Sequence, residues 1–373
     1  MTDRPDNEFE APRSKATERR ACRQCGAELT FAPGTTELTC GYCGFTDTID
    51  VGDASVEELD LHDHMERIGA AVHGRTTRFI DCPGCGATQH IEEKDKSMAC
   101  IYCARPLIVE DSYDEEWIVP GAVVPFKLEA REAHGRFRRW IDGLWFAPNA
   151  LKRATLSPEN TRGLYLPFWT FDANVSAAYR GERGEYYYVT KTVGSGENRR
   201  TVRERRTRWY PASGTVRGFI DDTLISASRA QGLAVPQVVR NWNLQELVPF
   251  DERFLAGFVT EKYGVSLEEG HVAAIDAARD TARQWARRDI GGDTQRVHHV
   301  DVQMADETFK HVLLPVYMST YRYKNTVYHF YVNGQTGAIH GDRPWSAWKI
   351  ALAVIAALLV LGAGGWAYIT YAA

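Results

Sequence analysis

The chain has 373 residues, of which 44% are apolar and 11% aromatic, so it can bury a sizeable core and is not a largely disordered protein. The formal net charge is −5, but the charge is unevenly spread along the chain. Residues 1–110 carry 12 Lys and Arg against 20 Asp and Glu, whereas residues 121–210 carry 17 against 9. The acidic N-terminal part would repel phosphate, which argues against nucleic-acid binding there.

Residues 1–20 are rich in Arg, Glu, Asp and Pro and contain no apolar run. This composition predicts a disordered arm. It also lacks the features of a secretory signal, so we expect the N-terminal part of the protein to lie in the reducing cytosol.

All eight cysteines belong to two copies of one pattern, C-x₂-C-x₁₄-C-x₂-C, spaced 60 residues apart. Two residues between thiols let one tight turn present both sulfurs to a single ion, and a hairpin then brings the second pair to the opposite side. We therefore predict two structural Zn²⁺ ions in zinc ribbons at residues 21–50 and 78–108. The expected metal ligands are Cys22, Cys25, Cys40, Cys43, Cys82, Cys85, Cys100 and Cys103.

Four thiolates complete the tetrahedral shell of zinc, so these sites are expected to be structural and not hydrolytic. Gly26, Gly44 and Gly86 follow their cysteines directly, whereas Ala104 follows Cys103 and predicts a slightly strained turn. We expect the ribbons to act as scaffold or as protein contacts, and metal removal to unfold mainly the first 110 residues. His90 lies inside a ribbon whose ligands are already complete.

A linker helix is predicted for residues 55–74. Ser55 and Glu58 form a capping box, and apolar residues follow at helical spacing. His62 and His64 are two residues apart on this helix and would point to different faces, so they are not a shared metal site.

Residues 117–260 have the pattern of an α+β body. An apolar strand-like run at 118–126 precedes a helix pattern from Ala130 to Leu144. Strand-like stretches follow at 164–179, 186–193, 201–210 and 214–225, with an antiparallel arrangement expected. The aromatic residues of the first stretch are expected to pack in the core: Tyr165, Phe168, Trp169 and Phe171.

Arginines crowd the segment that ends at Arg208. In strand geometry Arg203 and Arg205 share one face while Arg206 and Arg208 share the other, so the segment cannot be buried. It could be a solvated hairpin, contact anionic lipid or nucleic acid, or dock on the acidic ribbons; lipid is preferred over nucleic acid. The candidate contact residues are Arg199, Arg200, Arg203, Arg205, Arg206 and Arg208.

Residues 261–345 predict a second α+β module. A helix begins at the capping box of Ser266 and Glu269 and ends at Gly291–Gly292. Strands are expected at 297–304, 312–323 and 327–332, with a hairpin turn at Asn333–Gly334. This arrangement is similar to the small PepSY-type modules, which implies a regulatory or binding role.

His299 and Asp301 would share a strand face beside Asp293, an arrangement that could bind a metal or transfer a proton. A surface hydrogen bond is the simpler interpretation. The chain contains no phosphate loop, dinucleotide-binding fingerprint, nucleophile elbow or H-E-x-x-H motif, so no enzyme activity is predicted.

The last segment, 350–371, is uncharged and long enough to cross a bilayer core of about 30 Å. Aromatic residues flank it at the positions of interfacial belts: Trp345, Trp348, Trp366, Tyr368 and Tyr371. Arg343 and Lys349 lie on the N-terminal flank only, which predicts a single-pass, tail-anchored protein of the bacterial inner membrane with its body in the cytoplasm. A buried core helix is the alternative.

Several segments resemble a group of bacterial double zinc-ribbon membrane proteins catalogued under primosomal protein N-prime (replication factor Y), a superfamily II helicase. The resemblance runs from Cys22 to the C-terminal anchor and implies zinc ligation by the eight cysteines. It is carried by YLPFWTFDA (165–173), YPASGTV (210–216), ERFLAGF (252–258), FKHVLLPVYMSTYRY (309–323) and VNGQTGAIHGDRPWS (332–346).

Together these observations predict a membrane-anchored zinc protein that acts as a non-enzymatic binding or assembly factor for an unidentified partner. The alternative is a replication-associated protein that binds nucleic acid.

Overall fold

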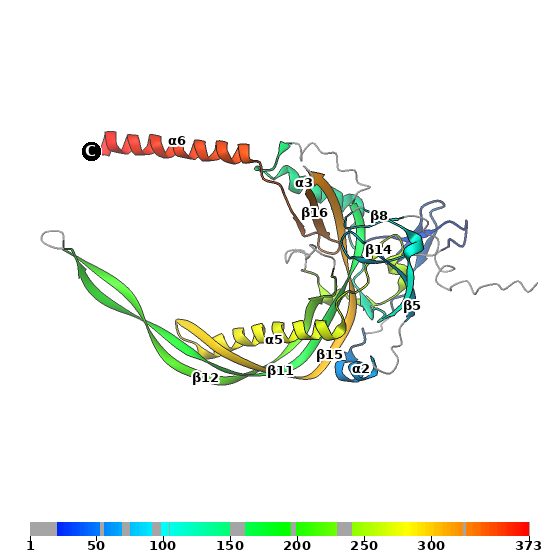
Figure 1. The fold of residues 1–373 in the computed structure, drawn as a ribbon, viewed down its shortest axis with the longest axis horizontal. Coiled ribbons are helices and arrows are strands. Elements are labelled where there is room, and N and C mark those ends of the chain that lie inside the picture. The colour runs from blue at the N-terminus through cyan, green and yellow to red at the C-terminus, as the bar shows by residue number, and fades with distance from the viewer. Residues whose placement is uncertain are drawn as a thin grey trace, which may run out of the picture.

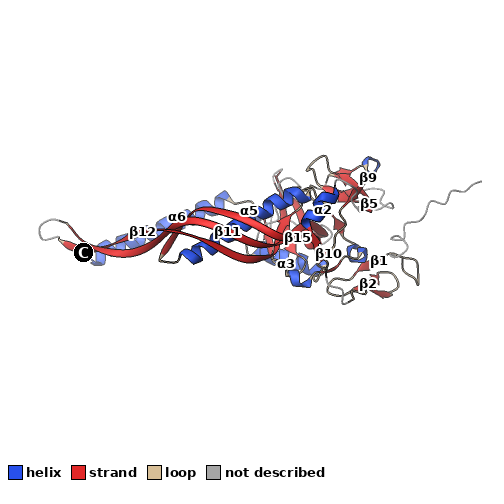
Figure 2. Cartoon of the chain, turned by 90° about the horizontal axis from the view of Figure 1, so that it is seen from below, coloured by secondary structure: helices blue, strands red, loops and turns tan. Residues whose placement is uncertain are grey.

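A computed structural model describes residues 21–52, 56–68, 75–91, 98–103, 105–149, 161–194, 199–229, 241–323 and 326–372. It shows a mixed α+β protein with two Cys₄ clusters near the N-terminus and one apolar C-terminal helix. A long strand hairpin and the C-terminal helix project from the body toward the same side (Figures 1 and 2). The expected disordered arm, 1–20, lies outside the described residues.

The main sheet has nine strands and is built on β11 (Thr161–Val193), which pairs antiparallel with both β15 (Thr294–Tyr323) and β12 (Arg200–Ser226). The sheet is mixed, which corrects the expectation of an antiparallel sheet. Two short strands enter through crossovers rather than hairpins, so β10 runs parallel to β15 and β14 parallel to β11. The short strands are β4 (Leu59–Asp60), β10 (Ala122–Val123), β13 (Val248–Pro249), β14 (Val259–Thr260), β16 (Thr326–Asn333) and β17 (Ile339–Gly341).

The four strand-like stretches expected between residues 164 and 225 are two continuous strands, because glycines inside them serve packing and not turns. A Cβ at Gly181 would lie 2.2 Å from the carbonyl oxygen of Arg296, and one at Gly184 would lie 2.6 Å from the Thr294 methyl group. The strands expected at 297–304 and 312–323 are likewise both part of β15. Glycine here lets neighbouring chains approach closely.

Both neighbours of β11 carry a β-bulge at the same level. Asp172 of β11 faces the first bulge, where Asp222 of β12 takes a φ of 49°, and Asp306 of β15 takes a φ of 52° at the second. Bulges bend strands and increase their twist. The three strands accordingly curve out of the body into the projecting hairpin (Figure 1).

Helix α5 (Leu267–Ile290) covers one face of the projecting strands. It begins at the predicted capping box of Ser266 and Glu269 and is followed by Gly291 at a φ of 63°. Ala278, Ala282 and Ala286 face the sheet and pack against β11 and β15. Since α5 and β15 complete the sheet of β11, the predicted boundary at residue 260 falls inside one folded unit.

Helix α3 (Ala130–Asp142) is placed where the sequence predicted it, and Phe137 and Ile141 pack on Phe330 of β16. Helix α2 (Leu61–Ile68) is shorter than the expected linker helix. Its first turn is capped by the Asp60 carboxylate, which accepts a hydrogen bond from Asp63 N at 2.8 Å. The predicted cap residue Ser55 lies outside the described residues.

The hairpin after β16 is present but wider than the two-residue turn expected at Asn333–Gly334. The Asn333 side chain accepts hydrogen bonds from the backbone N–H groups of Gln335 and Thr336, and Gly337 takes the positive φ of 75°. The chain then returns as β17.

The first Cys₄ module (residues 21–51) is a sheet of three short strands, β1 (Leu29–Phe31), β2 (Glu37–Cys40) and β3 (Thr46–Thr48). In the second Cys₄ module (79–107), β5 (Arg75–Asp81) pairs with β6 (Thr88–His90) and with β9 (Tyr113–Trp117). There β7 (Met98–Ala99) pairs with β8 (Pro106–Leu107). Short 3₁₀ turns lie at Val109–Asp111, Leu244–Glu246 and Glu252–Leu255.

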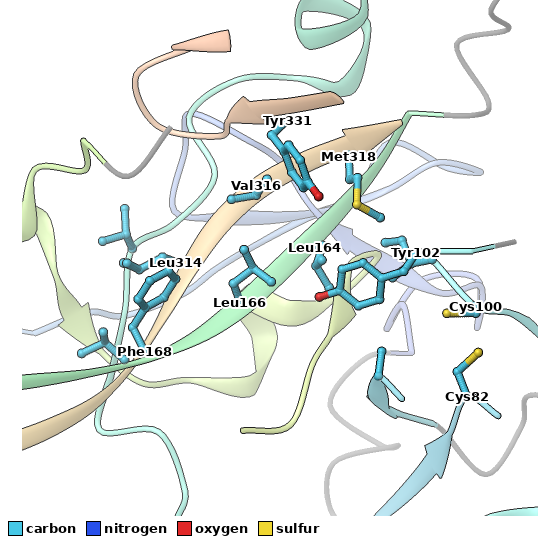
Figure 3. Packing of buried hydrophobic residues seen from close by; sticks show 14 of the residues in the cluster. Cys82, Cys100, Tyr102, Leu164, Leu166, Phe168, Leu314, Val316, Met318 and Tyr331 are labelled. Carbon is cyan, nitrogen blue, oxygen red and sulfur yellow. The ribbon is translucent and has the colours of Figure 1, made fainter. Parts of the chain in front are cut away.

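The two modules cover opposite faces of the main sheet. Along β11 and β15 the even-numbered side chains join the core of the second module, and Figure 3 shows Leu164, Leu166, Leu314 and Val316 on that side. The odd-numbered Tyr165, Leu313 and Tyr317 join the core of the first module. Successive strand residues point to opposite faces, so one pair of strands supports both modules.

Candidate metal centres

Each cysteine quartet is brought together as predicted. The Sγ atoms within a quartet lie within 4.8 Å of one another. The Sγ–Sγ distance is 3.5 Å in four pairs: Cys22–Cys43, Cys25–Cys40, Cys82–Cys103 and Cys85–Cys100. A tetrahedron with metal–sulfur bonds of about 2.3 Å has sulfur–sulfur edges of about 3.8 Å. Both quartets therefore have the size of a four-thiolate metal site.

Backbone turns hold the sulfurs in place. Gly26, Gly44 and Gly86 have φ values of 73° to 75°, which favour glycine, and each donates its N–H to the carbonyl of the cysteine four residues earlier. Ala104, where strain was expected, lies outside the described residues. Backbone N–H groups of Cys43 and Tyr42 lower the pKa of Cys40 to about 6, which favours the thiolate that a metal requires.

The first module is attached to the body through backbone and aromatic contacts. Phe31 N donates to the carbonyl of Ala256 at 3.0 Å, and the rings of Phe31 and Phe254 meet edge to face at 5.2 Å. Gly34 N donates to the carbonyl of Phe126 at 2.8 Å. Cys22 and Cys40 are buried, whereas Cys25 and Cys43 are exposed.

The second module is attached through a buried carboxyl that sequence reasoning missed. Glu261 accepts hydrogen bonds from the hydroxyls of Tyr102, which lies between two metal ligands, and of Ser228. Burial raises the pKa of Glu261 to about 7. The partners are far apart in the chain, so no local pattern signals this contact.

This carboxyl gives a pH-dependent prediction. Its folded pKa lies above that of the unfolded chain, so the stability it contributes is present below about pH 4.5 and is lost as the pH rises toward 7. Glu261→Gln cannot ionise. Relative to the native protein, its free energy of unfolding should rise by about 3 kcal/mol between pH 4.5 and 8, measured by urea denaturation. Glu110→Gln, at an exposed site, is the control; a pH-independent difference for Glu261→Gln contradicts the prediction.

A third group of potential metal ligands, Asp172, Asp221 and Asp222, lies at the first bulge. The ammonium of Lys310 already neutralises it, at 2.8 Å from Asp222 Oδ1 and 3.4 Å from Asp172 Oδ2. Lys310 also pairs with Glu58 Oε1 at 3.0 Å. A side chain therefore supplies the cation at this site.

The histidines stand apart from these centres. His299 and Asp301 are exposed on β15, Asp293 accepts a hydrogen bond from Tyr186 N, and none of the three belongs to a metal-binding group of the described residues. His62 and His64 do face different neighbours: His62 lies 3.5 Å from Glu307, and His64 packs on Phe309.

The predicted arginine cluster lies on the outer part of the hairpin, where β11 and β12 pair only with each other. This basic hairpin comprises Glu185–Val193 and Arg200–Arg208, with Arg199 before it. Arg203 and Arg205 lie over Tyr188 and Tyr186 at 4.7 and 4.2 Å from the ring centroids, and Arg208 lies over Tyr187 at 5.2 Å on the other face. The six arginines are exposed, and the hairpin points away from the Cys₄ modules (Figure 1).

Helix α6 (Ala347–Ala372) is long and apolar enough to cross a membrane over Ala347–Trp366, and none of that span is buried. Three tryptophans stand exposed at its base: Trp345 and Trp348 from the chain around its start, and Trp145 from the loop after α3. Lys349 Nζ donates to the carbonyls of Trp145 and Ala147, so the loop is held against the helix.

The chain is 26% identical over 341 residues to the uncharacterized protein YdjG of Bacillus subtilis (strain 168). The match covers 88% of this chain and 91% of YdjG. No family model matches the chain, and no solved structure matches it. The resemblance to the primosomal zinc-ribbon group therefore stays a prediction.

Proposed function

We propose that the protein is a membrane-anchored zinc protein that works as a non-enzymatic binding or assembly factor at the cytoplasmic face of the bacterial inner membrane. The observation that carries the proposal is α6, an apolar helix exposed on all sides. Such a surface is stable in a bilayer and not in water. The three tryptophans at its base have the amphipathic rings found at membrane interfaces.

Zinc is the metal that best fits the quartets. Four thiolates in a tetrahedral arrangement suit Zn²⁺, and the shell they complete leaves no position for a substrate or water. When bound, the two ions would hold the modules against the sheet. The metal sites therefore support a structural and not a catalytic role.

The cytoplasmic orientation is supported by Arg343 and Lys349 on the N-terminal side of α6, because basic residues mark the cytoplasmic flank of membrane helices. The second candidate function, replication-associated nucleic-acid binding, is favoured by the Tyr and Arg side chains of the basic hairpin, which resemble a base-stacking surface.

The anchor is tested by comparing the full chain with a chain that ends at Trp345. The full chain should resist carbonate extraction from membranes, whereas the shortened chain should be soluble because it lacks the apolar span. Two bound Zn²⁺ per shortened chain would show that the body is folded. A folded, shortened chain that still pellets with membranes would overturn the proposed anchor.

A further inference from the structure

The basic hairpin is a surface without a partner inside the protein. Beyond the Gly184–Thr294 pair β15 no longer accompanies it, and from Glu185–Arg208 to Val193–Arg200 it is a ribbon of two strands, about 30 Å long. Tyr188, Val193 and Val202 are exposed on it. A two-stranded ribbon without a covering layer is marginally stable in water, so a surface that binds it would stabilise it.

The charge of the hairpin selects an anionic partner. Residues 185–208 contain seven Lys and Arg against three Glu. Of the two glutamates described in this segment, Glu204 pairs with Arg206 and Glu185 with Arg183. Arg203, Arg205 and Arg208 lie over tyrosine rings, which hold the guanidinium groups without neutralising their charge.

The direction of the hairpin selects a membrane over other anions. The hairpin and α6 leave the body on the same side in both views (Figures 1 and 2). A bilayer that holds α6 therefore lies across the path of the hairpin. Because cations stand on both of its faces, the hairpin cannot enter the hydrocarbon and must meet the headgroups.

We infer that the basic hairpin is a second membrane contact, which lies on the anionic headgroups of the leaflet that α6 enters. The inference rests on the proposed anchor. It requires α6 to turn relative to the body about the link 342–346, between β17 and the helix, until the hairpin lies along the surface. Cationic and tyrosine side chains together suit this interface, since the rings pack among headgroups while the guanidinium groups bind phosphate.

The test uses the full chain in lipid nanodiscs made of phosphatidylcholine alone or with phosphatidylglycerol. Amide hydrogen exchange of residues 186–193 and 200–208 should slow severalfold in the anionic discs and not in the neutral ones, at 150 mM salt. Each basic residue near an anionic leaflet contributes about fivefold in affinity, equivalent to about 1 kcal/mol. Changing Arg203, Arg205, Arg206 and Arg208 to Gln should therefore abolish the protection, whereas changing all four to Lys should retain it.

Two results would overturn the inference. One is equal exchange of the hairpin in both kinds of disc. The other is protection of the same amides by DNA at 150 mM salt, with none in anionic discs, which would assign the hairpin to nucleic acid. Failure of the anchor is a separate observation, because the chain would then not enter discs of either composition.

Discussion

Replacing Cys82 by Ser should release one of the two metal ions and destabilise the whole body. The second module covers the even-numbered face of β11 and β15, so its loss exposes a core that includes Leu164, Phe168 and Leu314. Structural zinc supplies about 10 kcal/mol or more of folding free energy, and domains are stable by only about 5–15 kcal/mol. The near-ultraviolet circular dichroism of the aromatic core should largely disappear at 37 °C.

This expectation differs from the one drawn from the sequence, in which metal removal would unfold mainly the first 110 residues. The modules are not independent beads, because their cores are continuous with the sheet. Cys22→Ser should have a similar effect through the opposite face, whereas Arg23→Ser, at the exposed neighbour of that ligand, should keep both ions. If Cys82→Ser loses its metal while residues beyond 117 keep their protease resistance, the body is stable without the module.

Replacing Lys310 by Met should lower the free energy of unfolding by about 3–5 kcal/mol, because it leaves buried carboxylates without a cation. The Lys310 side chain is 7% exposed and contacts Glu58, Asp172 and Asp222. Burial alone would lower the pKa of Lys310, but the hydrogen bonds to Asp222 and Glu58 outweigh burial and raise it. The lysine is therefore charged throughout the neutral range.

Urea denaturation at pH 7 measures this loss. Adding Asp172→Asn to Lys310→Met should recover part of it, since Asp172 is the most buried of the three carboxyls and burial raises its pKa. Lys310→Arg keeps the charge and serves as the matched control. A loss below about 1 kcal/mol for Lys310→Met, as for a surface ion pair, would show that the carboxylates are solvated or protonated without it.

The local parts of the fold could be predicted from the sequence because their signals are local. The spacing of the cysteines fixed both quartets, and Ser266 with Glu269 marked the start of α5. The uncharged run near the C-terminus marked α6. In each case the residues that determine the structure lie within one or two turns of chain.

The long strands and the attachment of the modules could not be predicted, because they depend on distant contacts. Gly181 and Gly184 suggest turns until the approach of Arg296 and Thr294 is known. The contact of Tyr102 with Glu261 likewise joins segments with no shared local pattern. The basic stretch was predicted to be exposed, but its direction alongside α6 depends on the curvature of the whole sheet.

The placement of the two modules on opposite faces of one strand pair constrains how the protein is made. A ribosome delivers Cys103 about 200 residues before it delivers β15, and at about 5–20 residues per second this delay is roughly 10–40 s. Metal can close both quartets during that time, but Phe31, Ile80 and Ile91 have no sheet to cover until β15 pairs with β11. The N-terminal modules are thus the first parts to be synthesised and among the last to be buried, and they are the parts of the nascent chain that chaperones should bind.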